Sequence, residues 1–229
     1  MGATLIIPAR GGSKRILRKN IKDFNGRPMI SWPIMAALES DVFDQVLVST
    51  DDEEIARVAL ESGAEVPFER PKDLATSHVG TAPVIVHAIE ELGLADSEVV
   101  MCMYPTSPLP PGMLNEAVEL SSQRSETFVI SVGRYRAPIE RAARFQDNGY
   151  MEVENKKFLH FMTQDMPDWF FDAGKFHLAS AGCWRKNETM LSNAFFPFLL
   201  PDWASVDMDE PDDWPIAEAL HRAFVLEAQ

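Results

Sequence analysis

Residues 5–14 read Leu-Ile-Ile-Pro-Ala-Arg-Gly-Gly-Ser-Lys, and they decide the expected fold. The apolar run from Thr4 to Pro8 predicts a strand buried on both faces, as is typical of the centre of a parallel sheet. The two glycines that follow let the backbone adopt positive φ and approach a ligand closely. Because they directly follow a strand, the loop should lie at the carboxyl edge of the sheet, where open α/β sheets bind ligands.

The loop also concentrates positive charge. Together with the free N–H groups of the glycines and the Ser13 hydroxyl, its cations suit the oxygens of a phosphate group. A basic surface loop is the alternative interpretation, and the preceding strand favours the anion site. The spacing matches neither the Walker pattern nor the dinucleotide-binding fingerprint. Six cations lie within thirteen positions that contain no acidic residue: Arg10, Lys14, Arg15, Arg18, Lys19 and Lys22.

The composition limits the class of protein. The chain has 229 residues, of which 46% are hydrophobic, enough for a single domain over residues 1–229. Its net charge of −14 argues against nucleic acid as a partner. No apolar stretch is long enough to cross a bilayer and the start is not signal-like, so we expect no membrane partner. The two cysteines indicate no disulfide framework, and a reducing cytoplasm is the expected location.

Up to residue 132 the hydrophobic pattern alternates between strands and helices. This order predicts an α/β fold with a doubly wound, mostly parallel, Rossmann-like sheet. Residues 50–53 have the form of a capping box for the second helix. The expected strands are 4–8, 45–49, 65–68, 98–103 and 127–132, and the expected helices are 30–38, 53–60, 83–92 and 113–120.

The pattern changes after residue 132. Residues 144–153, interrupted by Asp-Asn-Gly, predict a hairpin. The segment 155–175 is irregular and rich in large apolar side chains, so we expect 134–175 to be an excursion that mediates dimerisation. A lid packed on its own domain is the alternative. Strands are expected at 175–179 and 204–209, followed by a final helix from Asp212 whose His221 lies on the surface. The large apolar groups of the excursion include Phe158, Phe161, Trp169, Phe170 and Phe171.

A second candidate site lies near the end of the chain, at Asp207 and Asp209. On a strand, positions two apart point the same way, so both carboxylates could face one cation. Few hard oxygen ligands, with room for water and a substrate phosphate, are typical of Mg²⁺. An ordinary acidic surface pair is the alternative, and the basic loop elsewhere in the chain favours the metal site.

Three further segments carry polar groups that could contact a substrate. Arg70 and Thr81 could flank a nucleotide base or ribose, although Arg70 could equally form a surface ion pair. Residues 104–108, Tyr-Pro-Thr-Ser-Pro, end a central strand, so their hydroxyls could face a polyhydroxylated substrate or simply form a turn. The stretches Gln164-Asp165 and Asp172-Ala173-Gly174 also add polar groups within the aromatic segment.

The basic loop resembles the signature of the sugar-acid cytidylyltransferases, Ala-Arg-x-Gly-Ser-Lys followed by Lys-Asn, here at 9–14 and 19–20. The similarity extends over most of the chain, through residues 48–51, 70–71, 105–108 and 207–209. It is strongest to the branch that acts on pseudaminic acid, within the group that includes the CMP-sialic acid synthetases. The resemblance implies a nucleotide-diphospho-sugar-transferase-like fold.

The resemblance also implies the roles of individual residues. CTP would bind at Pro8, Ala9, Arg10, Gly11, Gly12, Ser13, Lys14, Asn20, Arg70 and Thr81. The sugar would bind at Tyr104, Thr106, Ser107, Gln164, Asp165, Asp172 and Gly174. Mg²⁺ would bind at Asp207 and Asp209, and Arg10, Lys14 and Asp209 would carry the catalysis.

The expected reaction transfers CMP from CTP to the anomeric hydroxyl of a nine-carbon sugar acid and releases pyrophosphate. Two departures bear on the sugar: residues 175–178 read Lys-Phe-His-Leu where the pseudaminate branch usually has Gln-Phe-Tyr-Trp, and Met162-Thr163 replace an expected arginine. Sialic or legionaminic acid therefore remain alternative substrates. A non-catalytic nucleotide-binding module and a glycosyltransferase are alternatives from other functional classes. The sequence does not identify the residue that acts as general base.

Overall fold

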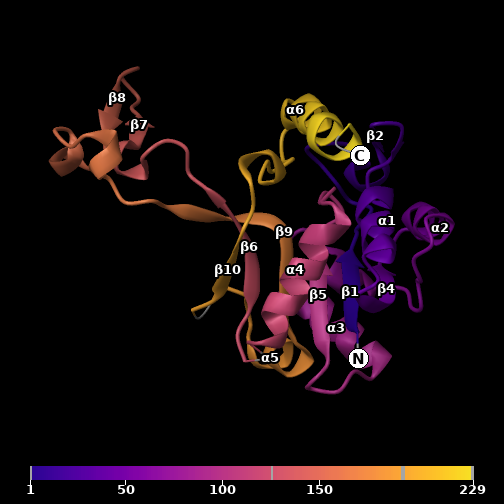
Figure 1. Cartoon of the computed structure of the whole chain (residues 1–229). Coiled ribbons are helices and arrows are strands. Elements are labelled where there is room, and N and C mark those ends of the chain that lie inside the picture. The colour runs from indigo at the N-terminus through magenta and orange to yellow at the C-terminus, as the bar shows by residue number, and fades with distance from the viewer. Residues whose placement is uncertain (1, 125, 192–193, 228–229) are drawn as a thin grey trace.

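The computed structural model describes residues 2–124, 126–191 and 194–227, and its body is built on a six-stranded sheet with the order β10-β6-β9-β5-β1-β4 (Figure 1). β1 pairs in parallel with β4 and β5, as the predicted mostly parallel sheet requires, and β10 pairs in parallel with β6. β9 lies between β5 and β6 and runs antiparallel to both. The strands are β1 Ala3–Pro8, β4 Phe43–Ser49, β5 Val99–Met103, β6 Val129–Arg134, β9 Phe170–Ser180 and β10 Phe196–Leu199.

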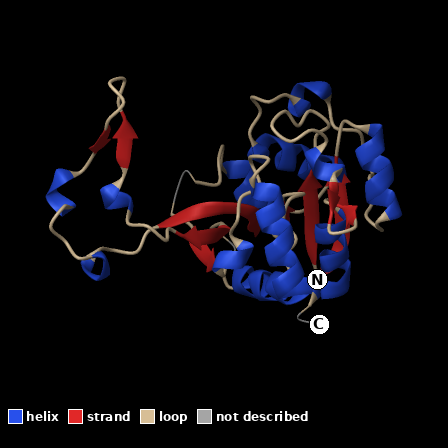
Figure 2. Ribbon diagram, turned by 90° about the horizontal axis from the view of Figure 1, so that it is seen from above, coloured by secondary structure: helices blue, strands red, loops and turns tan. Residues whose placement is uncertain are grey.

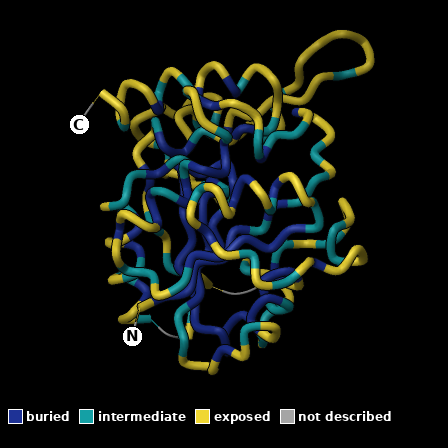
Figure 3. The backbone as a smooth tube through the Cα atoms, turned by 90° about the vertical axis from the view of Figure 1, so that its right-hand side faces the viewer, coloured by how far each residue is buried: buried dark blue, intermediate teal, exposed yellow. Residues whose placement is uncertain are grey.

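Helices cover both faces of the sheet because β1 is apolar on both faces. Leu5 and Ile7 pack in one core with α1, α2 and α4, whereas Ile6 packs in a second core with α3 and α5. All three side chains are fully buried, and Figure 3 shows the sheet as the buried centre of the molecule. The helices are α1 Ser31–Ser40, α2 Glu53–Glu61, α3 Thr81–Leu92, α4 Pro111–Ser122, α5 Ala181–Lys186 and α6 Asp213–His221.

The predicted helices are confirmed, with one correction at the start of α2. Asp52 caps this helix, since its carboxylate accepts the N–H groups of Glu54 and Ile55 at 3.0 Å. Thr50, the expected cap, is instead buried at the end of β4, and its hydroxyl accepts the N–H of Asp52 at 3.2 Å. Such a cap stabilises a helix by about 1 kcal/mol.

Two predicted strands are wrong. Residues 65–68 form no strand, because only Glu65 and Glu69 bridge to β4 and Pro67 between them has no N–H to donate. Residues 204–209 form a loop after a short 3₁₀ turn, Asp202–Ala204. The carboxylate of Asp213 accepts the N–H of Asp209 at 3.0 Å and that of Glu210 just after the loop at 2.7 Å, so these groups are not free for a sheet. The sequence analysis missed β10 of the main sheet and the short strands β2 Asp23–Phe24 and β3 Arg27–Pro28.

The hairpin is confirmed and belongs to an arm that leaves the sheet between β6 and β9. Its strands are β7 Ala143–Phe145 and β8 Met151–Val153. The arm projects away from the body instead of packing over it, so the lid interpretation is wrong (Figures 1 and 2). Residues 170–175, assigned to the excursion from the sequence, belong to β9, which is longer than predicted.

The end of the chain corrects one further expectation. His221 is 3% exposed rather than on the surface, and it packs between the rings of Phe24 and Trp32. Its Nδ1 lies 3.1 Å from the Nδ2 of Asn25, and burial lowers the pKa of His221 to about 4. A smaller two-stranded ladder, β2 Asp23–Phe24 with β3 Arg27–Pro28, completes this corner. Across the described ranges, no helix has both the length and the apolar character that crossing a bilayer requires.

Candidate active site

A cavity of about 490 Å³ opens at the carboxyl edge of β1 and β5. Its walls are the basic loop, the segment that leads into α3, the end of β5, and the loop that precedes α6. The cavity brings together these predicted site residues: Pro8, Arg10, Ser13, Lys14, Asn20, Arg70, Thr81, Tyr104, Thr106 and Asp209. Other predicted residues do not line it: Ala9, Gly11, Gly12, Ser107, Gln164, Asp165, Asp172, Gly174 and Asp207.

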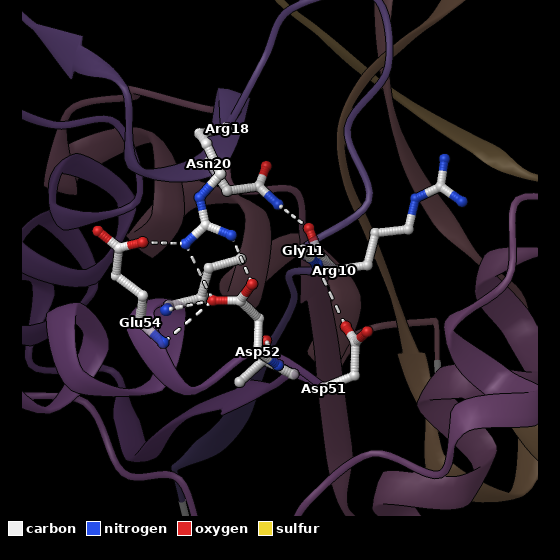
Figure 4. A network of polar contacts seen from close by, with 9 residues as sticks. Arg10, Gly11, Arg18, Asn20, Asp51, Asp52 and Glu54 are labelled. Carbon is white, nitrogen blue, oxygen red and sulfur yellow. Dashed lines mark hydrogen bonds and ion pairs between the residues drawn. The ribbon is translucent and has the colours of Figure 1, made fainter.

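The basic loop is fixed against the start of α2 (Figure 4). The N–H of Gly11 donates to Asp51 Oδ1 at 3.2 Å, and Asn20 Nδ2 donates to the carbonyl of Arg10 at 3.0 Å. Neither glycine has the positive φ expected from the sequence; the residue of this loop in the left-handed region is Arg18, with φ of 54°. Gly11 is required for a different reason: a Cβ there would overlap the carboxylate of Asp52.

This packing yields a prediction for two neighbouring glycines. Gly11→Ala should raise the KM for CTP and lower the free energy of unfolding by about 1–3 kcal/mol, because the added methyl group lies 3.0 Å from the Cβ of Asp52. Gly12→Ala is the matched control, since a Cβ there meets nothing within 4 Å, and it should keep the wild-type unfolding midpoint. Thermal unfolding of both variants checks this, and equal losses would contradict the packing argument.

Acidic neighbours neutralise several of the loop's cations. Arg18 binds the carboxylates of Asp52 and Glu54, and its hydrogen bond to Asp52 holds the pKa of that carboxyl below its ordinary value. Lys22 lies over the ring of Trp214, 4.4 Å from its centre. The structure shows no acidic partner for Arg10 or Lys14 in the part of the chain that it describes, and both line the cavity. These two cations are therefore the ones placed to meet an anion.

The basic loop and Asp209 meet across this cavity. Arg15 Nη2 lies 2.8 Å from Asp209 Oδ2, and Lys19 Nζ lies 3.4 Å from Asp209 Oδ1. Lys19 also donates to the carbonyl of Met208 at 2.9 Å. Segments some 190 positions apart in the chain therefore form one charged site.

Asp207 lies beside this site, although its expected place on a strand is wrong. Burial of its carboxylate and the negative charge of Asp209 raise the pKa of Asp207. A cation would relieve this repulsion. No group of three or more His, Cys, Asp or Glu within the described ranges could hold a metal. A cation here would thus have two protein carboxylates and further oxygens from water and substrate, a donor set that fits Mg²⁺.

Arg70 is 3% exposed, so the expected alternative of a surface residue is wrong, and the described residues give it no ion pair. Its Nε donates to the Ser49 hydroxyl at 3.1 Å, and its Nη2 donates to the Ser49 carbonyl. Burial lowers the pKa of Arg70 to about 10, so the guanidinium still carries its charge at neutral pH. The end of β4 therefore orients a buried cation at the cavity wall.

A polar chain runs from the cavity into β9. The hydroxyls of Thr81 and Tyr104 lie 2.7 Å apart, and the ring of Tyr104 meets that of His177 edge-on. His177 Nε2 lies 2.9 Å from Asp172 Oδ2, while the N–H of Gly174 donates to Asp172 Oδ1 at 2.9 Å. Burial opposes ionisation of Asp172, but the bonds to His177 and Gly174 outweigh it and hold its pKa below the ordinary value. Burial raises the pKa of Tyr104, which keeps its proton.

Other predicted sugar residues lie elsewhere. The Ser107 hydroxyl is buried and donates to the carbonyl of Lys175 at 2.9 Å, so it serves the fold. Gln164 and Asp165 are exposed on the arm, away from the cavity of their own chain (Figure 2).

Sequence reasoning missed Lys175, which is 2% exposed. Its Nζ donates to the carbonyls of Val206 at 2.7 Å and Thr106 at 3.2 Å. Burial lowers the pKa of Lys175 to about 8, opposed by the charge of Asp207. The signal in the sequence is a lysine inside an apolar strand pattern, directly after Asp-Ala-Gly.

Comparison with known proteins gives a consistent result. A family model described as cytidylyltransferase matches residues 4–169. A pseudaminic acid cytidylyltransferase from Campylobacter jejuni is 37% identical over 95% of both chains. A CMP-N,N'-diacetyllegionaminic acid synthase from Legionella pneumophila is 31% identical over 94% of both chains. A solved CMP:2-keto-3-deoxy-manno-octonic acid synthetase, complexed with CTP, has the same fold, with a TM-score of 0.70 at 16% identity, covering 97% of this chain and 99% of that one.

Proposed function

The chain belongs to the cytidylyltransferase family, and from this premise we propose that it transfers CMP from CTP to the anomeric hydroxyl of a nine-carbon sugar acid, with pseudaminic acid as the preferred substrate. The chain is a CTP-using nucleotidyltransferase. The observation that carries the proposal is the meeting of the basic loop with Asp209 in one cavity. The preference for pseudaminic acid is supported by the relative that shares 37% of its residues.

In the proposed mechanism, Arg10, Ser13 and Lys14 bind the triphosphate of CTP. The anomeric oxygen of the sugar attacks the α-phosphorus and forms the new P–O bond. The bond from that phosphorus to the bridging oxygen breaks, and pyrophosphate leaves with its electron pair. Arg10 and Lys14 stabilise the charge that builds on the phosphates, because positioning and electrostatics supply most of what such transfers need. A general base accepts the proton of the attacking hydroxyl, and we assign this role to no particular residue.

Asp207 and Asp209 would hold Mg²⁺. When bound, such a cation neutralises phosphate charge and lowers the pKa of a hydroxyl near it. Arg15 and Lys19 contact Asp209 at the cavity wall, where they could also contact the phosphates of CTP. Arg70 and Thr81 would then contact the nucleoside.

The sugar would lie toward Tyr104 and Thr106, which line the cavity where β5 ends. Asp172 of β9 lies behind them, connected through the contact of Tyr104 with His177. Sialic and legionaminic acid are the alternatives within the same chemistry, and the legionaminic acid synthase relative supports keeping the second. Residues 162–163 and 175–178 differ from the pseudaminate branch, and they lie on or near segments expected to face the sugar. The choice among these sugars therefore has to be tested directly.

Pyrophosphate release from CTP and pseudaminic acid with Mg²⁺ tests the function. Equal concentrations of pseudaminic, sialic and legionaminic acid in one reaction should yield mainly the pseudaminate product. CTP binding without pyrophosphate release from any of them would favour the non-catalytic module. Stabilisation of the fold by a nucleotide sugar but not by free CTP would favour the glycosyltransferase.

We further propose that the chain is one catalytic domain whose arm mediates a homodimer. The arm exposes Phe145 and Tyr150 by 72% and 74%, more apolar surface than an isolated loop would present to water. A dimer could also bring Gln164 and Asp165 of one copy to the cavity of the other. The cytoplasmic location stays a prediction.

The arm closes at its base, where the N–H of Tyr135 donates to the carbonyl of Trp169 at 2.9 Å. Replacing residues 136–168 by a short Gly-Ser linker should therefore leave the sheet folded and convert the dimer to a monomer in sedimentation velocity. A full-length chain that sediments as a monomer at micromolar concentration would contradict the proposal.

A further inference from the structure

A bulge in β9 lies directly beside the candidate active site. Ile130 of β6 faces His177 and Val132 faces Asp172, so Ser131 alone stands opposite residues 173–176. The Ser131 hydroxyl closes the bulge, since it accepts the N–H groups of Lys175 at 3.2 Å and Phe176 at 3.0 Å. Bulges of this kind redirect side chains next to active sites. Here the bulge directs Lys175 out of the strand ladder and beneath the cavity.

The ammonium of Lys175 joins two loops that are far apart in the sequence. The Thr106 carbonyl belongs to the segment that ends β5 and lines the cavity, and the Val206 carbonyl directly precedes Asp207. Hydrogen bonds from a charged donor are roughly twice as strong as neutral ones. The backbone of Lys175 adds to this junction, because its carbonyl accepts the N–H of Tyr104 at 2.9 Å.

The loop at residues 204–209, which carries Asp207 and Asp209, is not paired with any strand of the sheet. Lys175 binds the carbonyl of Val206 and Lys19 binds the carbonyl of Met208, so the two lysines fix the peptide groups 206–207 and 208–209. The carboxylate of Asp213 accepts the N–H groups of Asp209 and Glu210. Without Lys175 the first of these three attachments is lost, and it is the one that connects the aspartates to the β5 segment.

We propose that Lys175 is a positioning residue that holds the Asp207–Asp209 loop in register with the β5 segment, so that the carboxylates and the sugar site face the same point. The expected effects on kcat and KM rest on the proposed function. The role of Lys175 in holding the loop rests only on the contacts in the structure. Lys175 need not touch either substrate. It acts through the two carbonyls that it binds.

Lys175→Met tests this, because methionine matches the length and burial of the side chain but donates no hydrogen bond. It should lower kcat by at least roughly 30-fold while the KM for CTP changes less than about threefold, the pattern of a lost transition-state arrangement. Amide hydrogen exchange over 204–210 should become at least about tenfold faster. Lys175→Gln keeps an NH₂ donor and should recover part of both losses.

Trp184→Phe is the matched control, since it removes a buried hydrogen bond, from its Nε1 to the carbonyl of Val100 at 3.1 Å, without touching the ammonium or the two carbonyls that it binds. It should lower the unfolding midpoint but leave exchange over 204–210 within about threefold of wild type. Wild-type kcat and exchange in Lys175→Met, or the same losses in Trp184→Phe, would overturn the inference.

If Lys175→Met does not fold, the Lys175→Gln variant alone tests whether Lys175 positions the loop. Its shorter side chain must then raise exchange over 204–210 at least about threefold, and wild-type exchange would overturn the inference. A wild-type protein that releases no pyrophosphate with any nine-carbon sugar acid would remove the proposed function. The exchange measurement would still decide the role of Lys175.

Discussion

Asp209→Asn is expected to lower kcat by at least about 10³-fold, because it removes the negative charge that a catalytic cation needs while keeping the shape of the side chain. That loss corresponds to roughly 4 kcal/mol of transition-state stabilisation. Arg15 and Lys19 lie 2.8 and 3.4 Å from this carboxylate, so the substitution also removes the negative charge that these two cations share at the cavity wall.

The fold should survive the substitution of Asp209. Its side chain is 38% exposed and its contacts with Arg15 and Lys19 are near the surface, where ion pairs stabilise little. Circular dichroism and thermal unfolding check the fold, and pyrophosphate release checks the rate. Glu210→Gln is the matched control, because Glu210 also pairs with Arg15 but does not line the cavity, and it should keep most of the activity. An active Asp209→Asn variant would refute the metal role.

Arg10→Ala should lower kcat/KM for CTP by about 10²–10³-fold. The neighbouring cations Arg15, Arg18 and Lys19 are bound by acidic side chains, whereas Arg10 lines the cavity with no such partner in the ranges that the structure covers. The net charge of −14 makes this loss large, since an acidic protein repels a triphosphate unless local cations attract it.

The control for Arg10 is Arg57→Ala. Arg57 lies on α2 and pairs with Glu61 one turn away, with 59% of its side chain exposed. It removes the same charge from the protein as a whole, so its kcat/KM should stay within about threefold of wild type. Equal losses in the two variants would mean that overall charge, rather than the place of Arg10, governs CTP binding.

The sequence predicted the parts of the fold that follow from local patterns. The apolar run of β1 and the glycines after it needed no knowledge of distant segments; the strand is confirmed, and a cavity lies at its carboxyl edge. The antiparallel insertion of β9 was not predictable, because pairing with β5 and β6 depends on contacts between distant segments. Residues 204–209 show the opposite error, since an apolar-acidic alternation predicted a strand where the structure has a loop whose end is held by the carboxylate of Asp213.

The site was predicted in part for the same reason. Arg10, Lys14 and Asp209 share one cavity although the expected strand geometry around Asp209 is wrong. What holds the aspartate loop is a pair of lysine contacts, and the sequence alone cannot show that a bulge buries Lys175 beneath it. Gln164 and Asp165 belong to the arm, so no pattern within one chain could place them at its cavity.

A crystal structure with CTP and Mn²⁺ bound tests the central claim most directly. It should show the triphosphate against residues 10–14 and an anomalous Mn²⁺ peak between the phosphates and the carboxylates of Asp207 and Asp209. A nucleotide bound outside this cavity, or a metal that contacts neither aspartate, would contradict the account.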